Sequence, residues 1–170
     1  MLRSPLLRCL STSPRPKLYS LTCTSPGPTS SSLTSTGHAI LTDLPRASGG
    51  ENSHPEPVYL LLASLVSCEA ATASYVLRQL SPRLSLRSPL RFSVRAERDE
   101  RGSLALPIGE EPGAPAMLRR VWGTVEVSTT PAITDEQVEV LGRQVGRRCP
   151  VADMMKRAGV ELDVRFVRGE

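Results

Sequence analysis

Two cysteines, Cys68 and Cys149, are the residues of this 170-residue chain whose side chains are best suited to chemistry. Cys68 lies within the apolar stretch SLVSCEAATASYV (64–76) and is followed at once by an acid, Glu69. Cys149 lies in the stretch RRCPVADMM, where Pro150 favours the start of a helix. Because a helix N-terminus and the two preceding arginines both favour a thiolate, the sequence predicts that Cys149 is the more readily ionised thiol.

Cys68 has no comparable support from its neighbours in sequence. Glu69 opposes ionisation of the thiol unless it points away, and adjacent side chains on a helix point about 100° apart. A free cysteine in an apolar stretch is also commonly a small core residue. Cys68 and Cys149 are 81 residues apart with no clustered Cys or His beside them, which excludes a zinc site. Three interpretations stay open: inert core residues, a structural disulfide, or a redox pair.

The N-terminal segment differs from the rest of the chain in charge. The first 42 residues contain four basic residues and no acid, so they account for the whole net charge of +4. The remainder is neutral and has no clustered basic face beyond Arg147 and Arg148, so we expect no nucleic-acid partner.

The composition of residues 1–36, which are rich in Arg, Ser, Leu and Pro, is typical of an organelle transit peptide. The pattern Arg8-x-Leu10-x-x-Ser13 favours import into the mitochondrial (matrix) compartment, and a plastid is the other organelle considered. The alternative is a disordered tail without a targeting signal. The segment is too polar and too interrupted by Pro for a secretory signal or a membrane span. We therefore expect a tail over 1–36, which includes Cys9 and Cys23, and one folded domain over 37–170.

The folded part is predicted to contain a long helix near its start. A short strand over 37–44 and a Pro/Gly-rich loop over 45–57 precede the run VYLLLASLVSCEAATASYVLRQL, which Pro82 ends. The first half of this run is apolar on nearly all sides, so we expect a buried helix rather than a membrane span. Its many small residues allow another helix or a sheet to approach closely.

Alternating apolar and polar residues predict strands over 91–97, 120–127 and 160–167. The long, polar segment 98–119 between the first two has no predicted element. Between the last two strands, Thr134-x-x-Gln137 is a capping box that opens a helix, and Pro150 starts a second helical segment. The order β–α–β–β–α–β predicts an α+β fold in which an antiparallel sheet packs on two main helices.

Two stretches resemble the OsmC/Ohr family. GHAILTDLPRASGGENSHPEPVYLLLASLVSC is similar to its first motif, and VGRRCPVADMMKRAGVELDVRFV is similar to its second, so the resemblance covers about residues 37–170. The resemblance implies a compact α+β homodimer with interlocked chains. It also implies a thiol peroxidase that reduces organic hydroperoxides without a bound cofactor and is re-reduced by a dithiol such as a lipoyl group on a partner protein.

Carried over by position, Cys68 matches the cysteine that attacks the peroxide and Cys149 matches the resolving cysteine. Arg46, the only basic residue between Gly37 and Arg78, is the candidate for the arginine that holds the thiolate. The family's upstream Glu is missing, because those two positions are Val58 and Tyr59. The departure leaves an alternative function, a non-catalytic OsmC-like domain that binds a small apolar ligand or a partner.

Overall fold

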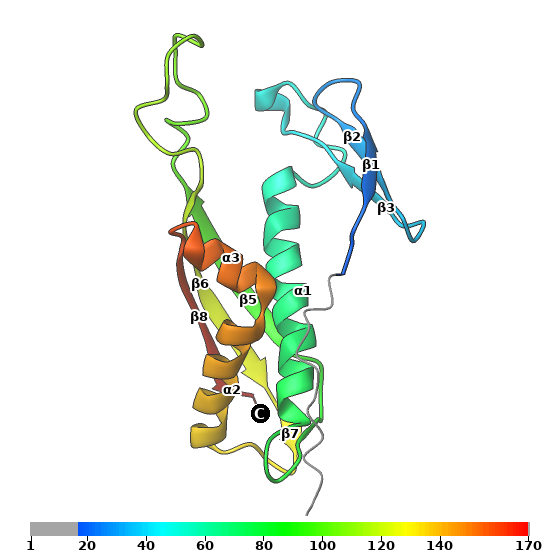
Figure 1. Ribbon diagram of the computed structural model, residues 1–170, viewed down its shortest axis with the longest axis vertical. Helices are drawn as coiled ribbons and strands as arrows, with labels where there is room; N and C mark the ends of the chain where they lie inside the picture. The colour runs from blue at the N-terminus through cyan, green and yellow to red at the C-terminus, as the bar shows by residue number, and fades with distance from the viewer. Residues whose placement is uncertain (1–16, 170) are drawn as a thin grey trace, which may run out of the picture. The chain divides into compact units, whose positions relative to one another are not determined.

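The computed structural model describes residues 17–169 (Figure 1). They form two compact units that meet in the sequence between Pro57 and Val58. The first unit is a three-stranded antiparallel sheet in the order β1-β2-β3. Its strands are β1 (Leu21–Thr24), β2 (Ser30–Thr34) and β3 (Ala39–Thr42). A short 3-10 helix, η1 (Arg46–Ser48), follows them.

The first unit confirms the strand expected over 37–44 but corrects the expected tail. Strands β1 and β2 lie within the segment 1–36, so the folded chain starts before residue 37. The segment is rich in Ser and Thr, which fit a solvated sheet as readily as they fit a leader. Residues 1–16, with Cys9 and the Arg8 pattern, lie outside the described part, and the transit-peptide prediction stays a prediction.

The second unit opens with helix α1 (Pro57–Leu77). A three-stranded sheet follows, built from β5 (Arg91–Arg98), β6 (Leu118–Val127) and β8 (Glu161–Arg168). Two further helices, α2 (Asp135–Arg148) and α3 (Pro150–Arg157), connect β6 to β8. Two short strands, β4 (Ser85–Leu86) and β7 (Thr129–Thr130), pair with each other.

The main sheet has the order β5-β6-β8 and is mixed, which corrects the antiparallel sheet that the sequence predicted. Strands β5 and β6 are antiparallel, but β6 and β8 are parallel, with Val121 opposite Leu162. The reason is the connection: α2 and α3 cross back along the sheet, and a strand–helix–strand crossover returns the chain in the same direction. Alternation alone indicates a half-buried strand and does not distinguish the two directions.

Other predicted elements are confirmed. The capping box is present, with the Thr134 side chain accepting from the Gln137 amide at 3.2 Å and the Gln137 side chain accepting from the Thr134 amide at 3.0 Å. Pro150 is the first residue of α3. Gly159, with φ 88°, follows that helix in the left-handed conformation that glycine adopts without strain.

Two apolar clusters fill the space between the helices and the sheet. Cluster A joins the second half of α1 and α2 to the sheet; its buried members are Ala73, Val76, Leu77, Leu84, Val127, Ile133, Val138, Leu141 and Val145. Cluster B joins the first half of α1 and α3 to the sheet; its buried members are Leu65, Leu118, Val121, Cys149, Ala152, Met155 and Val160. One face of the sheet is therefore sealed by helices.

Helix α1 is buried on one side only, which corrects the prediction of a fully buried helix. Leu65, Glu69 and Ala73 face the clusters, whereas Tyr59 and Tyr75 are 62% and 53% exposed. Within the second unit, the sheet β5-β6-β8 and the helices α2 and α3 cover only one side of α1. By length and composition α1 is the one helix among residues 17–169 that passes a test for a membrane span, a test that core helices of soluble proteins also pass.

Candidate thiol site

Cys68 lies in the middle of α1 and is half-buried. Its side chain packs against cluster B, the cluster that contains Cys149. The Cys68 carbonyl accepts a hydrogen bond from the Thr72 hydroxyl, one helical turn further on, at 2.8 Å. The nucleophile suggested by the sequence is therefore held on a regular helix beside an apolar core.

Cys149 occupies the elbow between α2 and α3. Its backbone is extended (φ −75°, ψ 112°), so that it ends the first helix and caps the second. The amide of Cys149 donates to the Val145 carbonyl at 2.9 Å, and its sulfur accepts from the Ala152 amide at 3.4 Å. Pro150 causes this elbow, because its ring and missing N–H prevent α2 from continuing.

The fold brings the two predicted cysteines together, although 81 residues separate them. Cys149 is a buried member of cluster B and Cys68 packs against that cluster, so that the Cys68 side chain lies close enough to raise the pKa of the Cys149 thiol. Both thiols are free. Two free thiols near each other in one apolar cluster are a candidate dithiol that an oxidant can convert to a disulfide.

The electrostatics of Cys149 correct the prediction that it ionises readily. Burial raises the pKa of the Cys149 thiol from 9.0 to about 11; the hydrogen bond from Ala152 lowers it, and the neighbouring Cys68 raises it further. Arg147 and Arg148 are exposed, and the Arg148 guanidinium hydrogen-bonds Gln144. Desolvation therefore outweighs the helix N-terminus at this thiol.

Arg46, the third predicted site residue, lies in η1 of the first unit and is exposed. Its loop is organised by Asp43, whose fully buried carboxylate accepts hydrogen bonds from the amides of Leu44 (2.7 Å), Glu51 (3.1 Å) and Ser53 (2.9 Å). These bonds, that of the Ser53 amide foremost, lower the pKa of Asp43 to about 2. Arg46 and the two cysteines belong to different units, so its role at the thiol site stays a prediction.

Glu69 is the residue whose importance sequence reasoning missed. It is 5% exposed, and its Oε2 has no hydrogen-bond partner. Burial raises its pKa to about 7, and the positive charge of Lys156 on α3 counteracts part of that rise. The only signal in the sequence was an acid in an apolar helix beside a cysteine.

An apolar cavity of about 360 Å³ adjoins cluster B. It is lined by Val58, Leu61, Arg98, Ala116, Met117, Leu118, Met154, Met155, Ala158 and Val160. Of these, Leu118, Met155 and Val160 are buried members of cluster B, which also contains Cys149. The cavity can therefore hold an apolar group next to the packing of the thiol pair.

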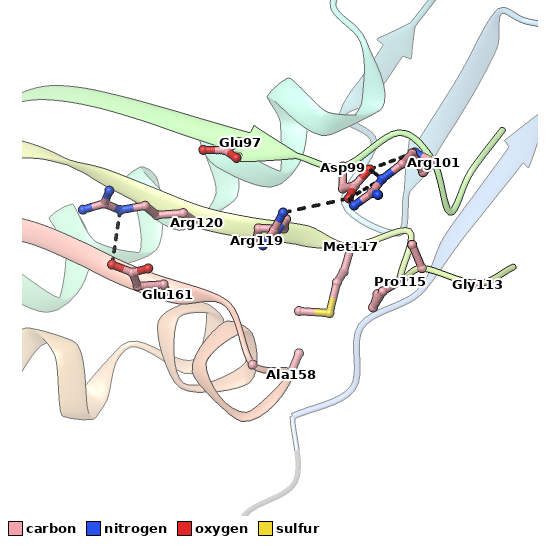
Figure 2. Close-up of a pocket in the computed structure, with 12 residues that line it drawn as sticks. Glu97, Asp99, Arg101, Gly113, Pro115, Met117, Arg119, Arg120, Ala158 and Glu161 are labelled. Carbon is pink, nitrogen blue, oxygen red and sulfur yellow. Dashed lines mark hydrogen bonds and ion pairs between the residues drawn. The ribbon is translucent and has the colours of Figure 1, made fainter. Parts of the chain in front are cut away.

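A larger cavity, of about 860 Å³, is charged and does not include the cysteines (Figure 2). The segment 98–119 forms much of its wall. Figure 2 shows the Asp99 carboxylate facing Arg101, at 2.6 Å, and Arg119, at 3.9 Å. Arg120 pairs with Glu161 at 3.2 Å on the same wall. Each of these arginines is paired with an acid, and no nucleophile lines the cavity, so the thiol pair is the better candidate for chemistry. No group of three or more His, Cys, Asp or Glu in the described part could hold a metal ion.

Comparison with known proteins agrees with this fold. A family model described as OsmC-like protein matches residues 50–165. No curated protein matches the chain. Similar solved structures include the OsmC-like protein from Mycoplasma pneumoniae (TM-score 0.69, 17% identity, covering 91% of this chain and 99% of that one).

Two hydroperoxide resistance proteins are also similar in structure. The protein from Legionella pneumophila has a TM-score of 0.63 at 16% identity, over 91% of this chain and 98% of that one. OhrB of Bacillus subtilis has a TM-score of 0.58 at 15% identity, over 89% of this chain and 98% of that one. Each match spans more of the chain than residues 37–170 alone provide, so strands before residue 37 belong to the shared fold.

Proposed function

The chain belongs to the OsmC-like protein family, and from this premise and the thiol pair we propose that it reduces organic hydroperoxides through Cys68 and Cys149. The observation that supports the proposal is the proximity of two free thiols at one apolar cluster. Hydroperoxide resistance proteins are among the structures that share the fold. The reaction needs no bound cofactor, because sulfur carries the electrons.

The chemistry proceeds in two steps. In the first, the Cys68 thiolate attacks the terminal oxygen of the hydroperoxide; an S–O bond forms, the O–O bond breaks, and the leaving alkoxide takes a proton to become an alcohol. In the second, the Cys149 sulfur attacks the sulfenic acid on Cys68; the S–S bond forms, and the thiol proton leaves with the hydroxyl as water. An external dithiol, such as a lipoyl group on a partner protein, reopens the disulfide and is itself oxidised.

The surroundings of the pair favour organic over inorganic peroxide. Cys68 packs against an apolar cluster, and the adjoining cavity is lined mainly by aliphatic side chains and methionines. Transfer of an alkyl group from water to such a surface lowers the free energy of binding, and hydrogen peroxide has no alkyl group to bury.

The test is turnover of cumene hydroperoxide with dihydrolipoamide by the wild-type chain and its cysteine variants. We expect Cys68→Ser to abolish turnover, and Cys149→Ser to stop after one equivalent of peroxide with a sulfenic acid on Cys68, detected by dimedone adduct mass. Cys23→Ser, which changes an exposed thiol in β1, is the matched control and should turn over normally. Normal turnover by Cys68→Ser would refute the proposal.

A second candidate function is a binding domain with inert thiols. The raised pKa of Cys149 and the replacement of the family's upstream acid by Val58 and Tyr59 favour it. The apolar cavity beside cluster B would then hold the ligand. In that case neither thiol is alkylated by iodoacetamide at neutral pH, and peroxide forms no disulfide between them.

We propose that two chains associate as a homodimer. The support is the side of α1 that its own chain leaves uncovered, with Tyr59, Leu61 and Tyr75 exposed. Apolar helix surface of this kind is stabilised by a second protein surface. Light scattering should give twice the mass of one chain, and Tyr75→Lys should shift the mass towards that of one chain.

The mitochondrial destination and the role of Arg46 are proposals of the same kind. Fusion of residues 1–36 to a fluorescent protein tests the first; co-localisation with a mitochondrial marker is expected, and plastid or diffuse signal would contradict it. Arg46→Gln tests the second. This substitution should slow the reaction of Cys68 with peroxide. An unchanged rate would mean that Arg46 is a surface residue of its loop with no role at the thiol site.

A further inference from the structure

Positive charge gathers on the elbow between α2 and α3, the corner that carries Cys149 (Figure 1). Four exposed cations on the second half of α2 and on α3 form what we call the elbow patch: Arg143, Arg147, Arg148 and Lys156. Arg143 and Arg147 lie one turn apart on the same side of α2. The Lys156 ammonium hydrogen-bonds the Gly146 carbonyl at 3.2 Å, so the charge of α3 lies beside the last turn of α2.

The elbow patch has no acidic partner. Among residues 17–169, none of its four side chains forms an ion pair; Arg148 hydrogen-bonds the neutral Gln144, and Lys156 bonds a backbone carbonyl. The acid of α3, Asp153, is already paired with Arg157 at 2.8 Å. By contrast, most arginines of the main sheet and of the segment 98–119 are paired with acids: Arg91, Arg98, Arg101, Arg119, Arg120, Arg165 and Arg168.

Helix ends explain only part of this arrangement. A cation in the last turn of a helix interacts favourably with the free carbonyls there, which suits Arg147, Arg148 and Lys156. Arg143 lies a turn earlier, and like charges four residues apart on a helix destabilise it slightly. The absence of acids around all four cations therefore favours a negative surface outside this chain. A patch of one charge raises the local concentration of an oppositely charged partner and speeds its association.

The elbow patch lies next to the thiol pair. Arg147 and Arg148 directly precede Cys149, and two residues of chain span at most about 7 Å, comparable with the Debye length of about 8 Å at physiological ionic strength. Cys149 is fully buried, whereas Cys68 is half-buried. Of the two sulfurs of a Cys68–Cys149 disulfide, the Cys68 sulfur is therefore the one that an external thiolate can reach.

We propose that the elbow patch docks an acidic surface of the protein that supplies the reducing dithiol. The inference rests on the proposed function, because the pair needs a reductant only if it cycles through a disulfide. The first thiolate of the partner attacks the Cys68 sulfur, the bond to Cys149 breaks, and the Cys149 sulfur takes up a proton. The second thiolate of the partner then attacks the partner's own sulfur in the mixed disulfide. Cys68 leaves with its electron pair, and the partner is oxidised to a disulfide.

The experiment measures reduction of the oxidised chain by peptides of the same chemistry and opposite charge. The full chain is oxidised with diamide, and the loss of its disulfide is followed after addition of a peptide that carries one dihydrolipoyl-lysine flanked by glutamates or by lysines. At about 20 mM salt we expect the second-order rate constant to be about tenfold higher for the acidic peptide. At about 0.5 M salt the two rate constants should approach each other, because screening removes the attraction.

The variants locate the attraction on the chain. Arg143→Gln/Arg147→Gln should slow reduction by the acidic peptide about fivefold at low salt and leave reduction by uncharged dihydrolipoamide unchanged. Comparison of variants with one peptide removes any difference in the peptides' own reactivity. The matched control is Arg91→Gln/Arg95→Gln, which removes as many exposed arginines from β5. Since Ala96 packs against cluster B, these odd-numbered side chains lie on the other face of the sheet, and both rates should stay as in wild type.

No preference for the acidic peptide at low salt would overturn the docking surface. Equal slowing of the acidic peptide and of dihydrolipoamide in the patch variant, or equal slowing by patch and control variants, would overturn it as well. Binding of the patch to vesicles of anionic phospholipid, without a preference between the peptides, would assign it to a membrane instead.

The two proposals fail in different ways. A wild-type chain in which diamide forms no Cys68–Cys149 disulfide would overturn both of them. A chain that is oxidised by diamide and prefers the acidic peptide, but turns over no hydroperoxide, would overturn only the proposed function.

Discussion

Replacement of Glu69 by Gln is expected to stabilise the fold at high pH and to change it little at low pH. Burial raises the pKa of Glu69 from 4.5 to about 7, so the folded chain binds a proton that the unfolded chain releases between these values. Stability from this group is complete below pH 4.5 and is lost as the pH rises through about 7. Because one pKa unit corresponds to 1.36 kcal/mol, the loss amounts to about 3 kcal/mol.

The assay is urea unfolding followed by circular dichroism at pH 4.5, 6, 7 and 8, at one fixed protein concentration because association also stabilises the folded state. The difference in unfolding free energy between Glu69→Gln and wild type should be small at pH 4.5 and grow to about 3 kcal/mol in favour of the variant at pH 8. Glu139→Gln, an exposed change on α2, is the control and should show no such growth.

A difference between Glu69→Gln and wild type that stays constant with pH would refute this reasoning, because it would mean that the Glu69 carboxyl titrates alike in the folded and unfolded chain. Growth of the difference in the opposite direction would mean that the ionised carboxylate stabilises the fold. In that case the attraction of Lys156, and not desolvation, would dominate the energetics of the site.

Three further outcomes follow from the structure. Alkylation of Cys149 in a Cys68→Ser chain should keep accelerating above pH 9, because burial, the largest cause of the raised pKa, remains in that variant, and a plateau at or below pH 9 would contradict it. Asp43→Asn should reduce the dependence of the unfolding free energy on pH in acid. The hydrogen-bonded Asp43 carboxylate stabilises the fold above pH 3.8, and this contribution is lost as the pH falls through about 2. An acid unfolding curve that is the same in wild type and variant, followed by circular dichroism, would argue against this role. Leu141→Ala, at a fully buried position of cluster A, should lower the unfolding free energy by about 2–5 kcal/mol in urea, and a loss below 1 kcal/mol would show that the cluster closes around the gap.

The elements around the thiols could be predicted from the sequence because their signals are local. Thr134 and Gln137 form their capping box within one turn, and Pro150 breaks the helix wherever it occurs. The direction of β8 could not be predicted in this way, since it depends on how α2 and α3 cross the sheet. Strands β1 and β2 were missed because Ser and Thr, free of acids, have the same composition in a leader and in a solvated strand.

The charged groups near the thiols show why neighbours in sequence are not sufficient to predict the electrostatics of a site. The helix N-terminus and two arginines beside Cys149 predicted a readily ionised thiol, yet the arginines point into solvent while the sulfur lies within cluster B. Helix dipoles and surface charges act over a high-dielectric path, whereas desolvation acts on the sulfur itself. The same argument applies to Glu69, which follows Cys68 in the sequence. The residues beside Glu69 in the sequence do not indicate its burial or the effect of Lys156, whose charge lowers the pKa of Glu69 from another helix.

These effects give the two thiols different roles in the proposed reaction. In the proposed reaction, Cys149 stays a neutral thiol inside the core, which limits its alkylation and over-oxidation before Cys68 is oxidised. A neutral thiol attacks slowly, so its contribution to disulfide formation depends on being held against the Cys68 sulfur.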